Sequence, residues 1–212
     1  MNVQEATTRR LPDLKERHLP ENCRETINTI LKETYGYEQF RNLEIYDDLS
    51  KGKEKLCISQ GQLIENVILE AEKAWKGETQ VDNILLTAPT GSGKSLLFQL
   101  PAIYLGKEYN LLTIVVSPLK ALIVDQVESL QELGYMRVAY ASSDLSPEQK
   151  MEVYRQVREG EIDLFYLSPE LLLSYDIKHF VGERRIGLVV VDEAHTVTTW
   201  GKEFRVDYWF LG

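Results

Sequence analysis

The sequence predicts an α/β domain in which a mainly parallel β-sheet is flanked by helices, with a helical N-terminal extension before it. Over residues 81–212, short continuous runs of β-branched and other apolar residues alternate with amphipathic stretches. Continuous apolar runs are typical of strands covered on both faces, and strand–helix alternation favours a parallel sheet with right-handed crossovers. Residues 1–80 are instead polar and helical in pattern. We therefore expect an extension with an insertion at 1–59 and one domain at 60–212.

The N-terminal part contains two expected helices. The first covers residues 24–34, and a longer one runs from about Gln60 to Lys76. Residues 42–59 between them show no clean period. We interpret this segment as an insertion or an ordered loop.

Five apolar runs are expected to form the sheet, at residues 83–87, 111–117, 137–141, 163–167 and 187–191. Helices are expected between them at 94–105, 119–133 and 147–158. The last of these has the clearest start. Ser146 is a suitable N-cap, Pro147 suits the first helical position, and Gln149 stands at the capping-box position.

Composition limits the classes of function. The net charge of −9 over 212 residues argues weakly against coating nucleic acid by bulk attraction, but it leaves room for a local groove. The two cysteines, Cys23 and Cys57, belong to no Cys/His cluster, so we expect free thiols and no structural zinc. No apolar run approaches the roughly 20 residues of a membrane helix, and the polar N-terminus lacks a secretory signal. We expect a cytoplasmic protein without a membrane partner.

A glycine-rich turn follows the first predicted strand. Residues 88–95 read APTGSGKS and fit the Walker A pattern G-x-x-x-x-G-K-[ST], with alanine in place of the first glycine. Such glycines let the backbone turn tightly and direct N–H groups at a polyphosphate. Lys94 is expected to reach the β- and γ-phosphates, and the Ser95 hydroxyl to bind Mg²⁺. A purely structural turn with a solvated lysine is the alternative. The predicted nucleotide-binding residues are Thr90, Gly91, Ser92, Gly93, Lys94, Ser95 and Leu96.

A pair of acids follows the last predicted strand, in the tetrapeptide Asp192, Glu193, Ala194 and His195. Ligands of parallel α/β sheets bind at the carboxyl ends of strands. We expect Asp192 to hold Mg²⁺, mostly through water, and Glu193 to orient and deprotonate the attacking water. His195 is expected to link the γ-phosphate site to a second motor domain or to nucleic acid. A solvated acidic turn and a capping histidine are the alternatives.

The two motifs together resemble those of superfamily 2 DEAH-box helicases, and further stretches resemble the RecQ family of DNA helicases. The most discriminating stretch is WGKEFR at 200–205, just after the acidic box. The others are GYEQFR at 36–41, KSLLFQLPA at 94–102, SPLKALIVDQV at 117–127 and YLSPE at 166–170. The resemblance implies the first RecA-like P-loop NTPase domain of a helicase, ATP and Mg²⁺ as cofactors, and DNA unwinding in the 3′ to 5′ direction.

The resemblance also implies a glutamine that reads adenine together with Arg41. In the family this glutamine follows the Phe-Arg pair within a few residues, whereas here Gln62 comes only after segment 42–59. We take Gln62 as the first choice for the base reader and Gln60 as its main rival. Two solvated glutamines at a helix start are the remaining interpretation.

Two groups of residues are candidates for nucleic-acid contact. Polar residues at strand ends, where helix N-terminal amides can also hold phosphates, are Ser117, Lys120, Ser168 and Glu170. Members of an aromatic-rich stretch, which can stack on unpaired bases, are Trp200, Phe204 and Arg205. Ordinary helix capping is the alternative for the first group, and packing in a core is the alternative for the second.

The family places a second RecA-like domain with an arginine finger after the last motif present here. We therefore expect this chain to represent the first motor domain, which binds ATP but hydrolyses it poorly and cannot translocate alone. The alternatives are a duplex DNA translocase or RNA remodeller of a defence or repair system, and a nucleotide-dependent DNA-binding scaffold.

Overall fold

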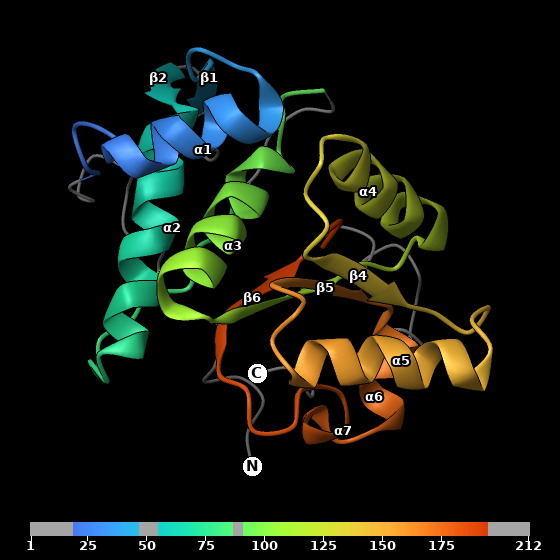
Figure 1. The fold of residues 1–212 in the computed structure, drawn as a ribbon. Coiled ribbons are helices and arrows are strands. Elements are labelled where there is room, and N and C mark those ends of the chain that lie inside the picture. The colour runs from blue at the N-terminus through green and yellow to red at the C-terminus, as the bar shows by residue number, and fades with distance from the viewer. Residues whose placement is uncertain (1–18, 47–54, 87–90, 195–212) are drawn as a thin grey trace, which may run out of the picture.

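The computed structural model describes residues 19–46, 55–86 and 91–194 (Figure 1). Its centre is a four-stranded sheet with the order β4-β5-β3-β6, in which every neighbouring pair is parallel. The strands are β3 (Leu112–Val116), β4 (Val138–Ala141), β5 (Leu164–Leu167) and β6 (Ile186–Val191). Strands β3 and β5 are buried at every position, as their continuous apolar sequences predict. The predicted α/β fold with a parallel sheet is confirmed.

Helices cover both faces of this sheet (Figure 1). One face packs against α1 (Glu25–Tyr35), α2 (Gln60–Trp75), α3 (Leu96–Tyr109) and α4 (Lys120–Glu132) through a single hydrophobic cluster. The other face packs against α5 (Pro147–Arg158), α6 (Pro169–Ser174) and α7 (Ile177–Val181) through a second cluster. All five helices expected from the sequence are present. The start of α5 has the predicted capping box of Ser146 and Gln149.

The N-terminal residues that the structure describes are part of the same packed unit. Ile27 and Leu31 of α1 are at most 1% exposed and belong to the cluster that contains Leu100 of α3. Burial of two such side chains stabilises the fold by roughly 1.5–3 kcal/mol each. The predicted extension is therefore integrated with the domain from α1 onward, and a boundary at residue 59 stays a prediction.

Segment 42–59 contains a β-hairpin. Strand β1 (Asn42–Tyr46) pairs antiparallel with β2 (Lys55–Ser59), and the outermost partners are Asn42 and Ser59. An apolar alternation, Leu43 and Ile45 in one strand and Leu56 and Ile58 in the other, is the signal for these strands that our interpretation as an insertion or an ordered loop did not use. Because Asn42 and Ser59 are paired, the residue before the hairpin, Arg41, lies beside the residue after it, Gln60.

The prediction of a strand at 83–87 is wrong for residues 83–86, which the structure describes. Residues 81–86 have no regular secondary structure, and Leu85 is 67% exposed. They line one side of a groove of about 730 Å³ that has β6 on its other side. Within the described ranges β6 forms its ladder with β3 alone. A strand needs a neighbour for its backbone N–H and C=O groups, and the apolar run 83–86 finds none in this part of the chain.

None of the helices that the structure describes is long and apolar enough to cross a membrane.

Candidate active site

The glycine turn leads directly into α3. Gly91 and Gly93 have φ angles of 79° and 78°, in the left-handed region that favours glycine. A Cβ atom on Gly93 would lie 2.7 Å from Nε2 of Gln60, so a larger residue would displace that side chain. The N–H groups of Leu96 and Leu97 bond to the carbonyls of Gly93 and Lys94, which starts the helix. Backbone conformation and space therefore both require the glycine that the phosphate-binding pattern places here.

The acid pair stands at the carboxyl end of β6. The Asp192 N–H donates to the Val116 carbonyl at 2.9 Å, which holds it beside the end of β3. Glu193 has a φ of 51° although it is not glycine, and its N–H donates to Oδ1 of Asp192 at 2.9 Å. A left-handed residue of this kind costs about 1–3 kcal/mol, and such strain concentrates at functional sites.

The glycine turn and the acid pair meet in one groove. Lys94, Asp192 and Glu193 all line the groove between residues 81–86 and β6. They come from opposite ends of the domain sequence. The acids follow the carboxyl end of β6, where ligands of parallel sheets bind, and Lys94 reaches the same groove from the start of α3. The structure thus joins a cation and two carboxylates in the combination that a magnesium–triphosphate complex needs.

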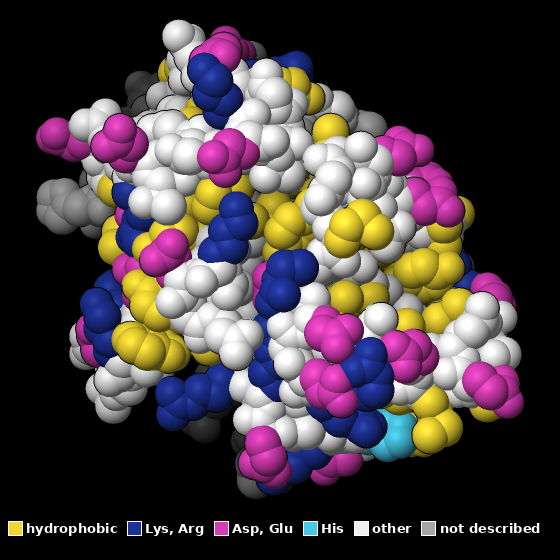
Figure 2. All heavy atoms as spheres, in the orientation of Figure 1, with side chains coloured by type: hydrophobic (Ala, Val, Ile, Leu, Met, Phe, Trp, Pro, Cys, Tyr) yellow, Lys and Arg dark blue, Asp and Glu magenta, His cyan; other side chains and the backbone are white. Residues whose placement is uncertain are grey.

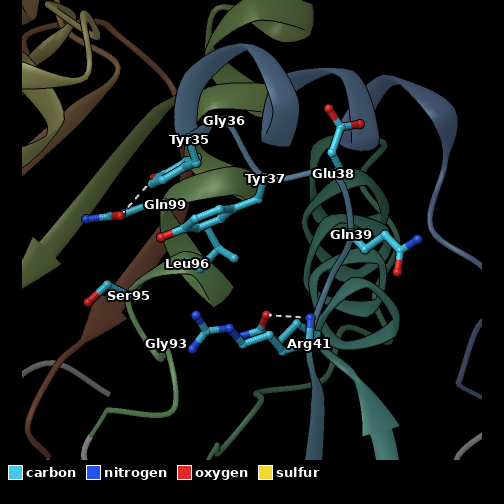
Figure 3. Close-up of a pocket in the computed structure, with 11 residues that line it drawn as sticks. Tyr35, Gly36, Tyr37, Glu38, Gln39, Arg41, Gly93, Ser95, Leu96 and Gln99 are labelled. Carbon is cyan, nitrogen blue, oxygen red and sulfur yellow. Dashed lines mark hydrogen bonds between the residues drawn. The ribbon is translucent and has the colours of Figure 1, made fainter.

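A second pocket, of about 360 Å³, lies next to the glycine turn (Figure 3). In Figure 3 the Tyr37 ring and the Arg41 guanidinium extend toward the turn, whereas Glu38 and Gln39 point away. Tyr37 is 51% exposed and stacks on Tyr35, with ring centroids 6.2 Å apart. A flat aromatic group and a guanidinium facing one cavity are suited to a planar heterocycle.

Gln60, and not Gln62, lines this pocket. The Gln60 amide is buried, accepts from the Arg41 N–H at 3.1 Å and donates to the Ser92 carbonyl at 3.0 Å. The hairpin makes this possible, because it returns Gln60 to Arg41, whose carbonyl accepts from the Gln60 N–H at 2.9 Å. Gln62 is turned back on its own helix, where Oε1 accepts from the Ser59 N–H at 3.0 Å in a capping box. The structure thus places Gln60, and not Gln62, in the lining of this pocket, and which of the two reads the base stays a prediction.

Ser95 has a partner that the sequence did not indicate. Its hydroxyl accepts a hydrogen bond of 2.7 Å from Nε2 of Gln126 in α4. Gln126 lies inside the stretch 117–127 that resembles a helicase motif, yet nothing in its helical spacing marks it as a neighbour of the glycine turn. Only the packing of α4 beside α3 brings the two side chains together.

The four candidates for phosphate contact at strand ends divide into two pairs. Ser117 is 1% exposed and Ser168 is 5% exposed. The Ser168 hydroxyl caps α6 by accepting from the Leu171 N–H at 3.4 Å. The ends of β3 and β5 carry both side chains into the interior, and a contact of either with phosphate stays a prediction. Lys120 and Glu170 remain at the surface.

Lys120 is the first residue of α4, a helix whose N-terminus has no side-chain cap. Its ammonium contacts the Asp144 carboxylate at 3.1 Å, and this contact lowers the pKa of that carboxyl group. The N-cap of α4, Leu119, provides no side-chain hydrogen bond to the helix, in contrast to Ser168 at α6. The first amides of α4 therefore lack the cap that would compete with an anion.

Charge on the surface is mixed. On the face shown in Figure 2, basic and acidic side chains lie side by side over α5, where Arg155 pairs with Glu152, Glu159 and Glu161. Such pairing leaves little field to attract a polyanion over this face. Any contact with nucleic acid is thus expected to be local.

Several predicted site residues lie outside the described part of the chain. They are Thr90 in the glycine turn, His195 in the acidic box, and Trp200, Phe204 and Arg205 in the aromatic-rich stretch. Their assignments stay predictions.

The fold and the site together define a RecA-like P-loop domain, in which a glycine turn before α3 and the acids at the end of the parallel strand β6 line one groove. The family model described as DEAD/DEAH box helicase matches residues 62–210. The chain belongs to the DEAD/DEAH box helicase family.

Within this family the sequence is RecQ-like. The chain is 30% identical over 187 residues to an ATP-dependent DNA helicase RecQ of Haemophilus influenzae, covering 88% of this chain and 25% of that protein. It is 34% identical over 191 residues to a RecQ helicase of a Synechocystis species, covering 89% of this chain and 33% of that protein. It is 32% identical over 180 residues to a RecQ helicase of Bacillus subtilis, covering 85% of this chain and 25% of that protein. The chain thus spans about a quarter to a third of these relatives' length.

The fold is also found in a solved helicase structure. The DUF1998 helicase MrfA, crystallised with DNA and AMPPNP, aligns with a TM-score of 0.50 at 22% sequence identity. The alignment covers 85% of this chain and 22% of that chain. At this identity the likeness supports the fold alone.

Proposed function

We propose that this chain is the ATP-binding motor domain of an ATP-dependent DNA helicase of the RecQ type, the part that couples ATP hydrolysis to movement along DNA. One observation carries the proposal: Lys94 of the glycine turn and the Asp192–Glu193 pair line one groove, with a pocket for a flat heterocycle on the other side of the same turn. A nucleotide carries a triphosphate and a base in one molecule. Two adjacent cavities that share the glycine turn therefore fit one nucleotide better than two separate ligands.

The residues present fit a magnesium nucleotide. Among the described residues no three His, Cys, Asp or Glu side chains gather to hold a metal by themselves. This agrees with Mg²⁺, which usually takes one or two protein oxygens and completes its shell with phosphate and water. Ser95 and Asp192 would hold the ion, which neutralises charge on the phosphates. Lys94 would bind the terminal phosphates, and Glu193 would orient and deprotonate the attacking water.

In the base pocket we assign the adenine-reading role to Gln60, with Arg41 and Tyr37 on the faces of the ring. Each amide group of glutamine has two donors and two acceptor sites. One acceptor site of Gln60 accepts from the Arg41 N–H, and one of its donors bonds to the Ser92 carbonyl. One donor and one acceptor site are left for a ligand. That remaining pair matches the donor and acceptor on the edge of adenine. Because Gln60 also holds Ser92, base recognition is tied to the glycine turn.

Substitution of the two glutamines separates the roles. Gln60→Ala is expected to weaken ATP binding about tenfold and to reduce the preference for ATP over GTP, because a pair of hydrogen bonds to the base is worth about 1 kcal/mol or more. Gln62→Ala is expected to remove only the capping box, costing roughly 1 kcal/mol of stability. Competition binding of ATP and GTP to the full-length variants measures both. Loss of base preference in Gln62→Ala alone would restore our original choice.

For DNA we propose contacts by Lys120 and Glu170 near the carboxyl edge of the sheet, with Trp200, Phe204 and Arg205 sensing unpaired bases. The relatives' names support DNA as the nucleic acid. Closure of a second RecA-like domain on this one would complete the motor. ATPase activity of the full-length protein, measured with single-stranded DNA, duplex DNA and RNA, tests the proposal. Stimulation by single-stranded DNA is expected, while stimulation by RNA alone, or by duplex DNA alone, would favour an RNA remodeller or a duplex translocase.

A further inference from the structure

A chain of polar side chains runs through the interior behind the base pocket and links Tyr35, Gln99 and Ser95 of its lining. It consists of Tyr35, Gln99, Gln126, Tyr166 and Ser95, and we call it the polar relay. Gln99 is 5% exposed and Tyr166 is 1% exposed. Hydrogen bonds in such surroundings are strong, and a broken one leaves a buried polar group without a partner. The relay is therefore expected to move as a connected set.

The relay has a direction. The Tyr35 hydroxyl donates to Oε1 of Gln99 at 2.8 Å, and Nε2 of Gln99 donates to Oε1 of Gln126 at 2.7 Å. Nε2 of Gln126 then donates to the Ser95 hydroxyl oxygen at 2.7 Å. Each amide receives at its oxygen and donates from its nitrogen, so every bond polarises the next in the same sense. The last donor occupies one lone pair of Ser95.

This last bond restricts how Ser95 can act. A hydroxyl has two acceptor lone pairs and one O–H that rotates to suit its partners. One lone pair of the Ser95 oxygen accepts from Gln126. The other lone pair of that oxygen is then restricted to one direction in which it can bind a metal ion. Groups that hold a metal ligand in this way commonly change metal affinity when they are removed.

The relay also includes a buried tyrosine of the sheet. Tyr166 lies in β5, and burial raises the pKa of its hydroxyl, as does the charge of the nearby Asp192 carboxylate. The Tyr166 hydroxyl donates to Oε1 of Gln126 at 3.4 Å. Ser95, one of the two predicted protein ligands of Mg²⁺, is thus held directly by a member of the relay.

Gln126 is the one member that lies on α4. This helix begins with Lys120, our proposed phosphate contact, and has no side-chain cap at its start. A shift of α4 when a phosphate is held there would change the contact between Gln126 and Ser95, because helices move as rigid bodies.

We propose that Gln126 is a positioning residue that sets the Ser95 hydroxyl for Mg²⁺ and couples that site to DNA bound at the start of α4. The inference rests on the proposed function, since it assumes a magnesium nucleotide and DNA as ligands. It assigns Gln126 no contact with the reacting atoms.

The test is calorimetric binding of ATP to the full-length protein in EDTA, in Mg²⁺, and in Mg²⁺ with a single-stranded oligonucleotide. For Gln126→Met, which keeps the side-chain length, we expect unchanged affinity for metal-free ATP. The gain in affinity from Mg²⁺ should fall about tenfold, and the oligonucleotide should no longer alter it. Gln126→Asn keeps the amide, but its side chain is too short to reach Ser95, so we expect the same result as for Gln126→Met. It replaces the methionine variant in the test if that variant does not fold.

The matched control is Gln131→Met, an exposed glutamine in the same helix, which should bind like the unaltered protein. If the unaltered protein shows no Mg²⁺-dependent ATP binding, the proposed function fails. If it does, and a folded Gln126 variant retains both the Mg²⁺ gain and the oligonucleotide effect, the inference about Gln126 fails alone.

Discussion

Replacing Glu193 by glutamine is expected to lower ATP turnover of the full-length protein by a factor of about 10² to 10⁴, the usual contribution of a general base. Glutamine keeps the size of the side chain and its ability to orient water, but it cannot accept the proton. Glu193 lines the groove with Lys94, and its left-handed backbone is already specified by the turn after β6. ATP binding should therefore be retained.

The measurement is steady-state ATP hydrolysis with saturating single-stranded DNA, with ATP affinity measured in parallel. Glu183→Gln is the matched control, because it makes the same chemical change at an exposed position before β6. Turnover of Glu193→Gln within threefold of the unaltered protein would remove Glu193 from the catalytic role. It would also strengthen the reading of the chain as a nucleotide-dependent scaffold.

The largest effect on stability is expected at Asp163. This side chain is fully buried and holds Arg137 with a shortest contact of 2.6 Å, Arg184 at 2.9 Å and the Tyr135 hydroxyl at 3.0 Å. Asp163→Ala would leave the almost buried Arg184 guanidinium without its counter-charge. Breaking a buried pair from one side costs about 3–5 kcal/mol, which is a large share of a domain's stability.

Thermal and urea unfolding of the 212-residue chain, followed by circular dichroism, measures this loss. Glu152→Ala is the control, since Glu152 and Arg155 form a pair whose side chains are 53% and 42% exposed. Exposed pairs contribute about 0–1 kcal/mol, so this variant should unfold close to the unaltered chain. Equal losses in the two variants would contradict the central place of Asp163 in the fold.

Elements with a strong local signal were predictable. Helix α5 has both the capping box at Ser146 and an unbroken amphipathic pattern, and its predicted bounds match the structure. Strands β3 and β5 are apolar throughout because both of their faces are covered, and that pattern needs no knowledge of neighbours. The glycine turn and the acid pair were predictable for a similar reason, since their chemistry requires those residue types at that spacing.

Features that depend on a partner distant in sequence were not predictable. Residues 83–86 have the composition of a strand, but in the described structure they lie across a groove from β6 and form no ladder with it, which their local sequence does not indicate. Ser117 and Ser168 look like phosphate contacts by position, yet depth below the surface is a property of the assembled sheet. The choice between Gln60 and Gln62 depended on the hairpin, which decides which residue faces Arg41. Gln126 was found only through its contact with Ser95.

The proposed function requires that the glycine turn and the acid pair serve one magnesium nucleotide. Titration of the full-length protein with ATP, in EDTA and in Mg²⁺, tests it through Lys94→Ala and Asp192→Asn. Lys94→Ala should weaken ATP binding in both conditions, whereas Asp192→Asn should remove the gain from Mg²⁺ and leave metal-free binding unchanged. If Asp192→Asn keeps the full Mg²⁺ gain while Lys94→Ala loses binding, the two motifs do not share a ligand and the account is contradicted.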